Sequence, residues 1–178
     1  MLYYDTNMGV LDAWRRAHRR FGGHVGAAFG IGADELALVA QAQVAELHRW
    51  SNLAAPLVRP RRSLLTTLHH EDRDAIYGFI ADSRTRYSGP ELHQTLQAFN
   101  GFILRQWHAA VRSGEQVDRY ELDQEDCAAI AHGARHDFLD WANIPLALAV
   151  PRDGLIRPLA NADESGLYAL IGPWRKAS

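Results

Sequence analysis

The stretch "HRWSNLAAPLVRPR", residues 48–61, decides how this sequence is expected to fold, because a second version of it lies near the other end of the chain. Residues 139–152 read "LDWANIPLALAVPR", with Trp, Asn, Leu, Pro and Arg in the same places. In both versions a helical pattern ends at Asn, and a short apolar run containing proline follows. This order of residues predicts a helix end followed by a short extended connector.

The similarity between the two ends extends well beyond these connectors. Residues 33–80 align with residues 124–171 at a constant spacing of 91 and without a gap. Twelve of the 48 aligned positions are identical, against about three expected from average amino-acid usage. The repetition indicates an internal duplication, with units at residues 1–86 and 87–178 and a boundary in "SRTRYSGPE", residues 83–91. Trp50 and Trp141 form one identical pair, and we interpret them as core anchors.

Each unit is predicted to begin with an amphipathic helix. In the first unit, apolar residues recur at helical spacing from Val10 to Phe21, and the residues from Asp5 to Asn7 offer an N-terminal cap. In the second unit, the matching helix begins at Pro90 and continues through residue 111. The two units therefore start in the same way.

The remainder of each unit is predicted to repeat one order of elements. Helical segments cover residues 34–52 and 124–143, with breaks near Gln43 and at Gly133. The apolar connector comes next. A helical piece then closes each unit, with Asp72 or Asp163 capping its last helix. The expected fold class is all-α, with two tandem helical repeats and short extended connectors.

Composition favours a folded protein without membrane segments. Of the 178 residues, 47% are hydrophobic, which is enough to bury a core. No apolar run approaches the roughly 18 residues of a membrane span, and the N-terminus lacks the pattern of a secretion signal. We therefore expect a cytoplasmic protein with no membrane partner. Cys127 is the only cysteine, so we expect no internal disulfide and interpret it as an apolar packing residue.

The net charge of −2 hides an uneven distribution along the chain. Residues 1–90 carry 11 Lys and Arg against 9 Asp and Glu, whereas residues 91–178 carry 8 against 12. A protein that binds nucleic acid through bulk charge carries a larger basic excess. The first unit is nevertheless the better candidate for contact with an anion.

At this point the order of residues resembles a known family, the bacterial flagellar regulator subunits called FlhD. The resemblance covers residues 7–80 and, through the internal repeat, extends more faintly to residues 91–171. It rests on a first helix, an Ala-x-Phe segment, an acidic-capped Ala-rich helix, a helix ending in Asn and a short apolar segment ending in Arg. The matching residues are Ala27, Ala28, Phe29, Ile31, Asp34, Glu35, Ala37, Val44, Leu47, Asn52, Leu57, Val58, Arg61, Leu64 and Leu68.

The resemblance implies a helical transcription regulator that acts with a second, zinc-binding, FlhC-like subunit to bind promoter DNA and recruit RNA polymerase. Related pairs control the transfer genes of conjugative elements. Because FlhD forms dimers, a tandem fusion is expected to be a covalently linked pseudo-dimer. This chain departs from the family pattern in having Pro60 in place of a Phe, a shorter link near Gln43, and the unit twice.

One basic cluster is the candidate DNA-binding site. "RPRR", residues 59–62, lies just before a predicted helix, where arginine side chains can hold phosphates. The second unit keeps only one arginine of this cluster. We predict DNA contact through Arg59, Arg61, Arg62 and Arg152; a solvated basic turn is the alternative.

A second basic cluster is the candidate partner-binding surface. "WRRAHRR", residues 14–20, spreads arginines around a helix whose other face is apolar. The residues assigned to partner binding are Trp14, Arg15, Arg16, Arg19 and Arg20. An ordinary solvated helix face is the alternative interpretation.

Metal-binding and catalytic patterns are weak in this sequence. His132 and His136 stand at helical i,i+4 spacing near Asp137, but Gly133 occupies the place of the Glu in a His-Glu-x-x-His zinc motif. "HHED", residues 69–72, keeps only its aspartate in the second unit, which favours helix capping over catalysis. We predict no metal site, no cofactor and no enzymatic activity.

Three hypotheses for function remain after this comparison. The leading one is a non-enzymatic transcription activator that works in a complex with an FlhC-like subunit. The second is a small helical metal-binding protein or enzyme that uses the histidines. The third is a protein–protein adaptor or anti-activator, which would bind the same partner but repress transcription.

Overall fold

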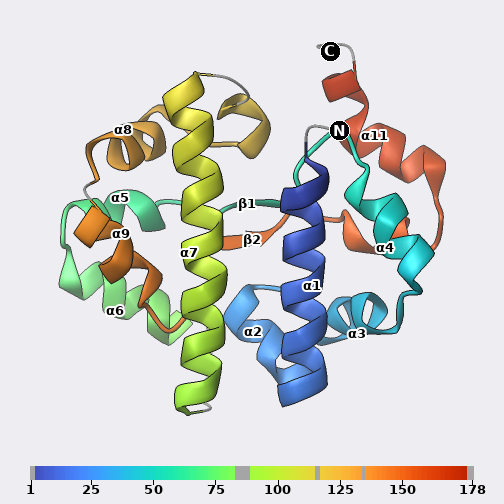
Figure 1. Ribbon diagram of the computed structural model, residues 1–178, viewed down its shortest axis with the longest axis horizontal. Coiled ribbons are helices and arrows are strands. Elements are labelled where there is room, and N and C mark those ends of the chain that lie inside the picture. Colours follow the sequence, from blue (N-terminus) through green and yellow to red (C-terminus); the bar gives the residue numbers. More distant parts are fainter. Residues whose placement is uncertain (1–2, 83–88, 115–116, 134, 176–178) are drawn as a thin grey trace.

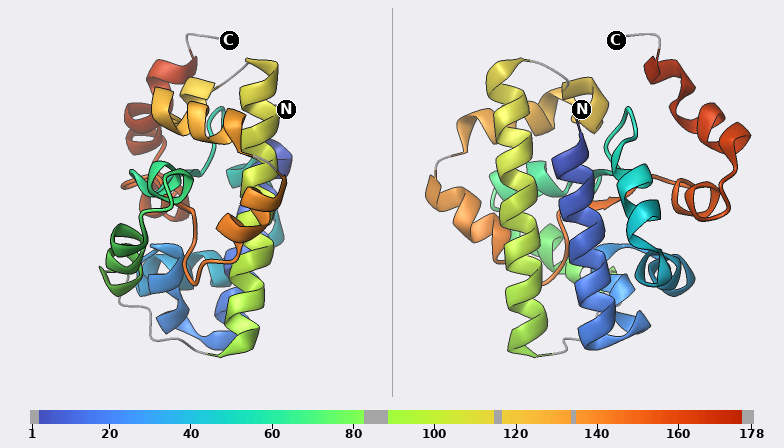
Figure 2. Two further views of the ribbon diagram at one scale, coloured as in Figure 1. Left: turned by 90° about the vertical axis from the view of Figure 1, so that its left-hand side faces the viewer. Right: turned by 45° about the vertical axis from the view of Figure 1, so that its right-hand side comes forward.

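The computed structural model describes residues 3–82, 89–114, 117–133 and 135–175 (Figure 1). It is mostly helical, which confirms the predicted all-α class. Two long helices, α1 (Tyr4–Phe21) and α7 (Pro90–Ser113), lie side by side at its centre and run in opposite directions (Figures 1 and 2). The other elements flank this central pair on both sides.

The shorter elements follow the two long helices in a similar order, although α2 has no counterpart among the described residues after α7. After α1 come η1 (Gly23–Val25), α2 (Gly26–Phe29), α3 (Ala33–Gln41), α4 (Val44–Ser51), β1 (Val58–Pro60), α5 (Leu64–His69) and α6 (Arg73–Asp82). After α7 come η2 (Val117–Tyr120), α8 (Gln124–His132), α9 (Arg135–Ala142), β2 (Ala149–Pro151), α10 (Ile156–Ala160) and α11 (Glu164–Arg175). The predicted helix breaks near Gln43 and at Gly133 are confirmed, as are the extended connectors.

The helix caps predicted at Asp72 and Asp163 are confirmed, whereas the cap predicted at residues 5–7 is not. The backbone N–H of Ala75 donates to Asp72 Oδ1 over 3.1 Å, and that of Gly166 donates to Asp163 Oδ1 over 2.9 Å, so both aspartates cap their helices. The N-terminal cap predicted at residues 5–7 is wrong. Helix α1 already begins at Tyr4, and Asn7 faces the core with no exposed surface.

The two connectors pair with each other, which the sequence analysis did not predict. β1 and β2 form an antiparallel ribbon in which Arg59 lies opposite Val150. Just outside the strands, Arg61 N–H donates to Leu148 O over 2.8 Å, and Arg152 N–H donates to Leu57 O over 2.9 Å. The ribbon crosses behind the central helices and joins the two sides of the molecule (Figure 1).

The helices that follow each strand pack on the opposite side of the molecule. Helix α5 contacts α8, and helix α10 contacts α3. One side therefore combines α7, α8 and α9 with α5 and α6, while the other combines α1, α3 and α4 with α10 and α11 (Figure 1). The described residues share one continuous hydrophobic cluster, because each strand carries its chain across the centre.

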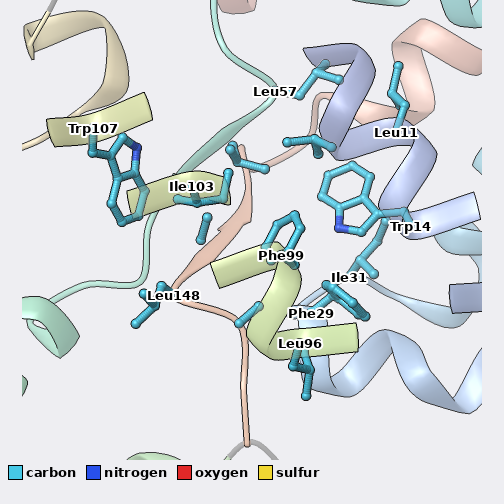
Figure 3. Packing of buried hydrophobic residues seen from close by; sticks show 14 of the residues in the cluster. Leu11, Trp14, Phe29, Ile31, Leu57, Leu96, Phe99, Ile103, Trp107 and Leu148 are labelled. Carbon is cyan, nitrogen blue, oxygen red and sulfur yellow. The ribbon is translucent and has the colours of Figure 1, made fainter. Parts of the chain in front are cut away.

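Aromatic side chains fill this cluster near the central helices (Figure 3). Phe29 meets Phe99 of α7 edge to face, with ring centroids 5.2 Å apart. Trp14 has no exposed surface, and the predicted core anchors Trp50 and Trp141 are 1% and 5% exposed, as expected. Cys127, predicted as an apolar packing residue, is half-buried.

Two buried asparagines hold the connectors onto the long helices. Asn7 of α1 donates through Nδ2 to Ala55 O over 3.0 Å and accepts through Oδ1 from Leu57 N–H over 2.8 Å. Asn100 of α7 donates to Leu146 O over 2.9 Å and accepts from Leu148 N–H over 2.9 Å. Each side chain thus satisfies backbone groups that would otherwise be buried without a partner.

Replacing either asparagine by alanine is expected to lower the free energy of unfolding by about 3 kcal/mol, because buried backbone groups of the connector lose their partners. Asn52→Ala, at an exposed helix end, is the matched control and should change stability by less than about 0.5 kcal/mol. Chemical denaturation of the three variants measures the difference. Equal stability of Asn7→Ala and Asn52→Ala would contradict the role of Asn7.

Candidate partner and nucleic-acid interface

A groove with an apolar floor lies between α1 and the first half of α7. Its volume is about 650 Å³. The floor consists of small and aromatic side chains from both helices: Ala13, Ala17, Phe21, Ala98, Phe99 and Phe102. The residues from α1 follow one another at intervals of four, so they lie on one face of that helix, and the residues from α7 face them. The α7 side of the groove was missed in the sequence, because only the antiparallel packing of the helices brings it beside α1.

Arginines of α1 edge this groove. Arg16, Arg19 and Arg20 all line it. Arg16 pairs with Asp12 over 3.0 Å and Arg20 pairs with Glu91 over 2.9 Å, but these side chains are more than half exposed, so the pairs are weak and exchangeable. An apolar floor with a basic edge suits an acidic, amphipathic segment of another protein.

The other two residues assigned to partner binding lie deeper. Trp14 is entirely buried in the core, so the structure corrects its assignment to a partner-binding surface. Its position follows from the helical period, which places it between Val10 and Ala17 on the inward stripe of α1. Arg15 is half-buried beside it. The partner surface of α1 is thereby reduced to the exposed arginines.

The predicted DNA-binding arginines divide into exposed and structural groups. Arg62 is exposed, and no ion pair is found for it within the described part of the chain. Arg59 pairs with Asp153 over 2.9 Å, and its side chain is 28% exposed. Of the four predicted arginines, Arg62 is the most exposed, and Arg59 keeps part of its surface.

Arg61 and Arg152 are instead held inside the structure. Arg61 Nε donates to Ala147 O over 3.1 Å, and one of its terminal nitrogens is buried without a hydrogen-bond partner. Arg152 is 9% exposed, pairs with Glu121 over 2.6 Å and donates to Arg119 O. Burial lowers the pKa of both guanidinium groups from the ordinary arginine value. Their geometry makes them structural residues of the ribbon.

Removing Arg152 is expected to cost more than removing Arg61. Arg152→Met takes the counter-ion from Glu121 and a donor from Arg119 O, so we expect a loss of about 2 kcal/mol in unfolding free energy. Arg61→Met takes a donor from Ala147 O but separates no ion pair found among the described residues, so we expect a smaller loss of about 1 kcal/mol. Denaturant titration compares the two variants, and a larger loss at Arg61 would contradict this assignment.

One carboxyl group has a strongly shifted pKa. Asp126, in the first turn of α8, is 4% exposed. Burial raises its pKa to about 6, and the nearby charge of Asp123 contributes in the same direction. Asp123 N–H donates to Asp126 Oδ2 over 3.4 Å, and Asp123 Oδ1 accepts from Asp126 N–H over 2.7 Å, so the two residues form a helix-capping box. The carboxyl group of Asp126 therefore serves the start of α8.

The shift predicts a pH-dependent stability with a definite sign. Because the folded protein binds the Asp126 proton more tightly than the unfolded chain, the free energy of unfolding should fall as pH rises from about 4 to about 6. The Asp126→Asn variant lacks this dependence. The free energy of unfolding of the wild type, relative to that of the variant, should therefore increase as the pH falls toward 4. Asp34→Asn, at an exposed position in the first turn of α3, is the control. A difference that stays constant with pH would contradict the shift.

The histidines do not form a metal-binding arrangement. His132 Nδ1 lies 2.7 Å from Ala128 O, within its own helix, and His136 Nε2 lies 2.9 Å from its neighbour Asp137. Within residues 3–82, 89–114, 117–133 and 135–175, no group of three or more His, Cys, Asp or Glu side chains is placed to hold a metal ion. The metal-binding alternative gains no support from this geometry.

Comparison with known proteins finds no protein-family model, curated protein or solved structure that matches this chain. In addition, none of the described helices combines the length and the hydrophobicity that a membrane crossing requires. The assignment of a function therefore depends on the geometry and on the residues themselves.

Proposed function

We propose that the chain is a tandem duplication of an FlhD-like unit and acts as one subunit of a transcription regulator. The hydrogen bonds of the asparagines support the duplication. Asn7, in the first turn of α1, and Asn100, in the middle of α7, bind connector residues that are 91 apart, Leu57 and Leu148. The two asparagines are 93 residues apart, whereas the connector residues are 91 apart. The second unit therefore has two fewer residues than the first between its asparagine and its connector.

Backbone conformation supports the duplication independently of side chains. Positive φ angles are uncommon outside glycine, so their repetition at a fixed spacing is informative. Three pairs of residues 91 apart share this conformation: Gly30 and Glu121, Ser63 and Gly154, and Glu71 and Ala162. In each pair the two φ angles differ by less than 10°. Turns that require the same strained backbone at matching positions favour two copies of one fold.

The antiparallel pairing of β1 with β2, behind the antiparallel helices α1 and α7, is the observation that carries the functional proposal. Pairing of equivalent elements across a centre is what a covalently joined dimer would require. This arrangement fits the resemblance to the dimeric FlhD family. The proposed activity is therefore non-enzymatic: with an FlhC-like, zinc-binding subunit, the chain binds promoter DNA and recruits RNA polymerase, for example at transfer genes of a conjugative element.

The proposal assigns different tasks to the two basic regions. The groove edged by Arg16, Arg19 and Arg20 receives the protein partner, because it combines apolar surface with positive charge. Arg62, with a smaller contribution from Arg59, touches the DNA backbone within the complex. Since few exposed arginines remain for DNA, most of the affinity comes from the partner.

Co-expression with an FlhC-like subunit tests this function. We expect the two chains to co-purify and to shift promoter DNA together in a gel mobility assay, whereas the chain alone gives no shift. Partner binding without any DNA shift, together with loss of the shift given by the partner, would identify an anti-activator. Failure to bind the partner would contradict the proposal.

Charge reversal in the groove provides the sharper test. Arg16→Glu with Arg19→Glu should weaken partner binding by about tenfold or more, because both charges face the incoming acidic segment. Arg73→Glu with Arg157→Glu, at exposed positions outside the groove, is the matched control and should bind normally. Arg62→Ala should leave partner binding intact and reduce the salt slope of DNA binding by about 1. Equal effects of the two charge reversals would contradict the role of the groove.

A further inference from the structure

The contact between the two proposed units contains a pair of matched positions that face each other. Gly9 in α1 and Phe102 in α7 are 93 residues apart, the same spacing as Asn7 and Asn100. They also touch: a Cβ atom built on Gly9 would lie 2.6 Å from Cζ of Phe102. A residue that meets its own counterpart lies on the pseudo-twofold axis, where a true homodimer would place two identical side chains.

Gly9 has no local reason to be a glycine. It lies inside α1, where glycine costs about 1 kcal/mol relative to alanine, and its backbone is helical. The ring of Phe102 supplies the reason, because it occupies the space that a side chain at position 9 would need. Two second units would bring Phe against Phe at this point, and two first units would leave Gly against Gly without a ring between them.

The ribbon repeats this unlike pairing at its own centre. Arg59 lies opposite Val150, and these residues are again counterparts, 91 apart. Side chains directly opposite in an antiparallel pair point to the same face and lie close together. A pair of first units would therefore set Arg59 against a second Arg59.

Two ion pairs join the first unit to the second, Arg20 with Glu91 and Arg59 with Asp153. In both pairs the first unit supplies the arginine and the second unit supplies the carboxylate. The counterpart of Asp153 in the first unit is Arg62. In a pair of first units, Arg59 would meet an arginine where it now meets an aspartate. The uneven charge of the two halves is thus matched across their contact.

We propose that the contact between the units is heterospecific: each unit fits the other, and neither fits a second copy of itself. The small-and-large pair at the helices disfavours both like pairings, and the charge pattern at the ribbon disfavours a pair of first units. The first unit therefore pairs with the second unit of this fold. A separate single-unit chain that resembles either half does not pair with its like unit in the same way. This inference rests on the proposed duplication but on neither DNA binding nor the FlhC-like partner.

Substitutions in the full chain reproduce the like pairs. Gly9→Phe creates the Phe–Phe contact, and Phe102→Gly creates the Gly–Gly contact. Each should lower the melting temperature by about 5 °C or more. The swapped variant, Gly9→Phe with Phe102→Gly, should melt above Gly9→Phe alone and lose less than the sum of the two single losses. If the losses simply add, or if the swap is no more stable than Gly9→Phe, the inference is overturned.

The ribbon provides a second, electrostatic measurement. Val150→Arg sets Arg59 against an arginine, whereas Val150→Gln introduces a polar side chain without charge. At low ionic strength Val150→Arg should melt below Val150→Gln, and this gap should close at about 0.5 M salt, where charges are screened. If the two variants melt at the same temperature at low salt, the electrostatic part of the inference is overturned. Because both measurements follow stability alone, they succeed or fail independently of the DNA and partner-binding experiments.

Discussion

The structure depends on the way in which two buried asparagines receive the connectors. A short apolar connector that enters a core brings backbone N–H and C=O groups with it, and these must be hydrogen-bonded. Asn7, in the first turn of α1, and Asn100, in the middle of α7, each supply both a donor and an acceptor. With the connectors fixed in this way, β1 and β2 meet in register, and the helices that follow are carried to the opposite side.

This crossing also determines which arginines are free to bind another molecule. Arg61 and Arg152 follow the strands directly, and Ala147 O and Glu121 hold their side chains, so their charges serve the ribbon. Arg62 comes one residue later and stays exposed. The arginines of α1 edge an apolar groove, where charge and hydrophobic surface act together. Our proposal therefore places partner recognition on α1 and a minor share of DNA contact on the ribbon.

Local features of the fold were predictable from the sequence, and features that join distant segments were not. Helical periodicity, the breaks near Gln43 and Gly133, and the caps at Asp72 and Asp163 depend on neighbouring residues. The role of Asn7 depends on backbone groups about 50 residues away, so its polar character was taken for a helix cap. Similarly, the burial of the arginines follows from strand pairing, which no local pattern encodes. The sequence shows the basic cluster, but it does not show which of its arginines are exposed and which are held by the ribbon.

The exchange of helices between the two sides determines when the chain can fold during its synthesis. Helix α5 packs on α8, yet α8 begins more than 50 residues after α5 ends. At ribosomal rates of about 5–20 residues per second, several seconds separate the synthesis of the two helices. During this time α6 is the neighbour available to Leu64, Leu65 and Leu68, and the surface that α8 supplies in the finished fold has not yet been made. The nascent first half therefore exposes apolar side chains, which is the kind of surface that makes chaperones necessary.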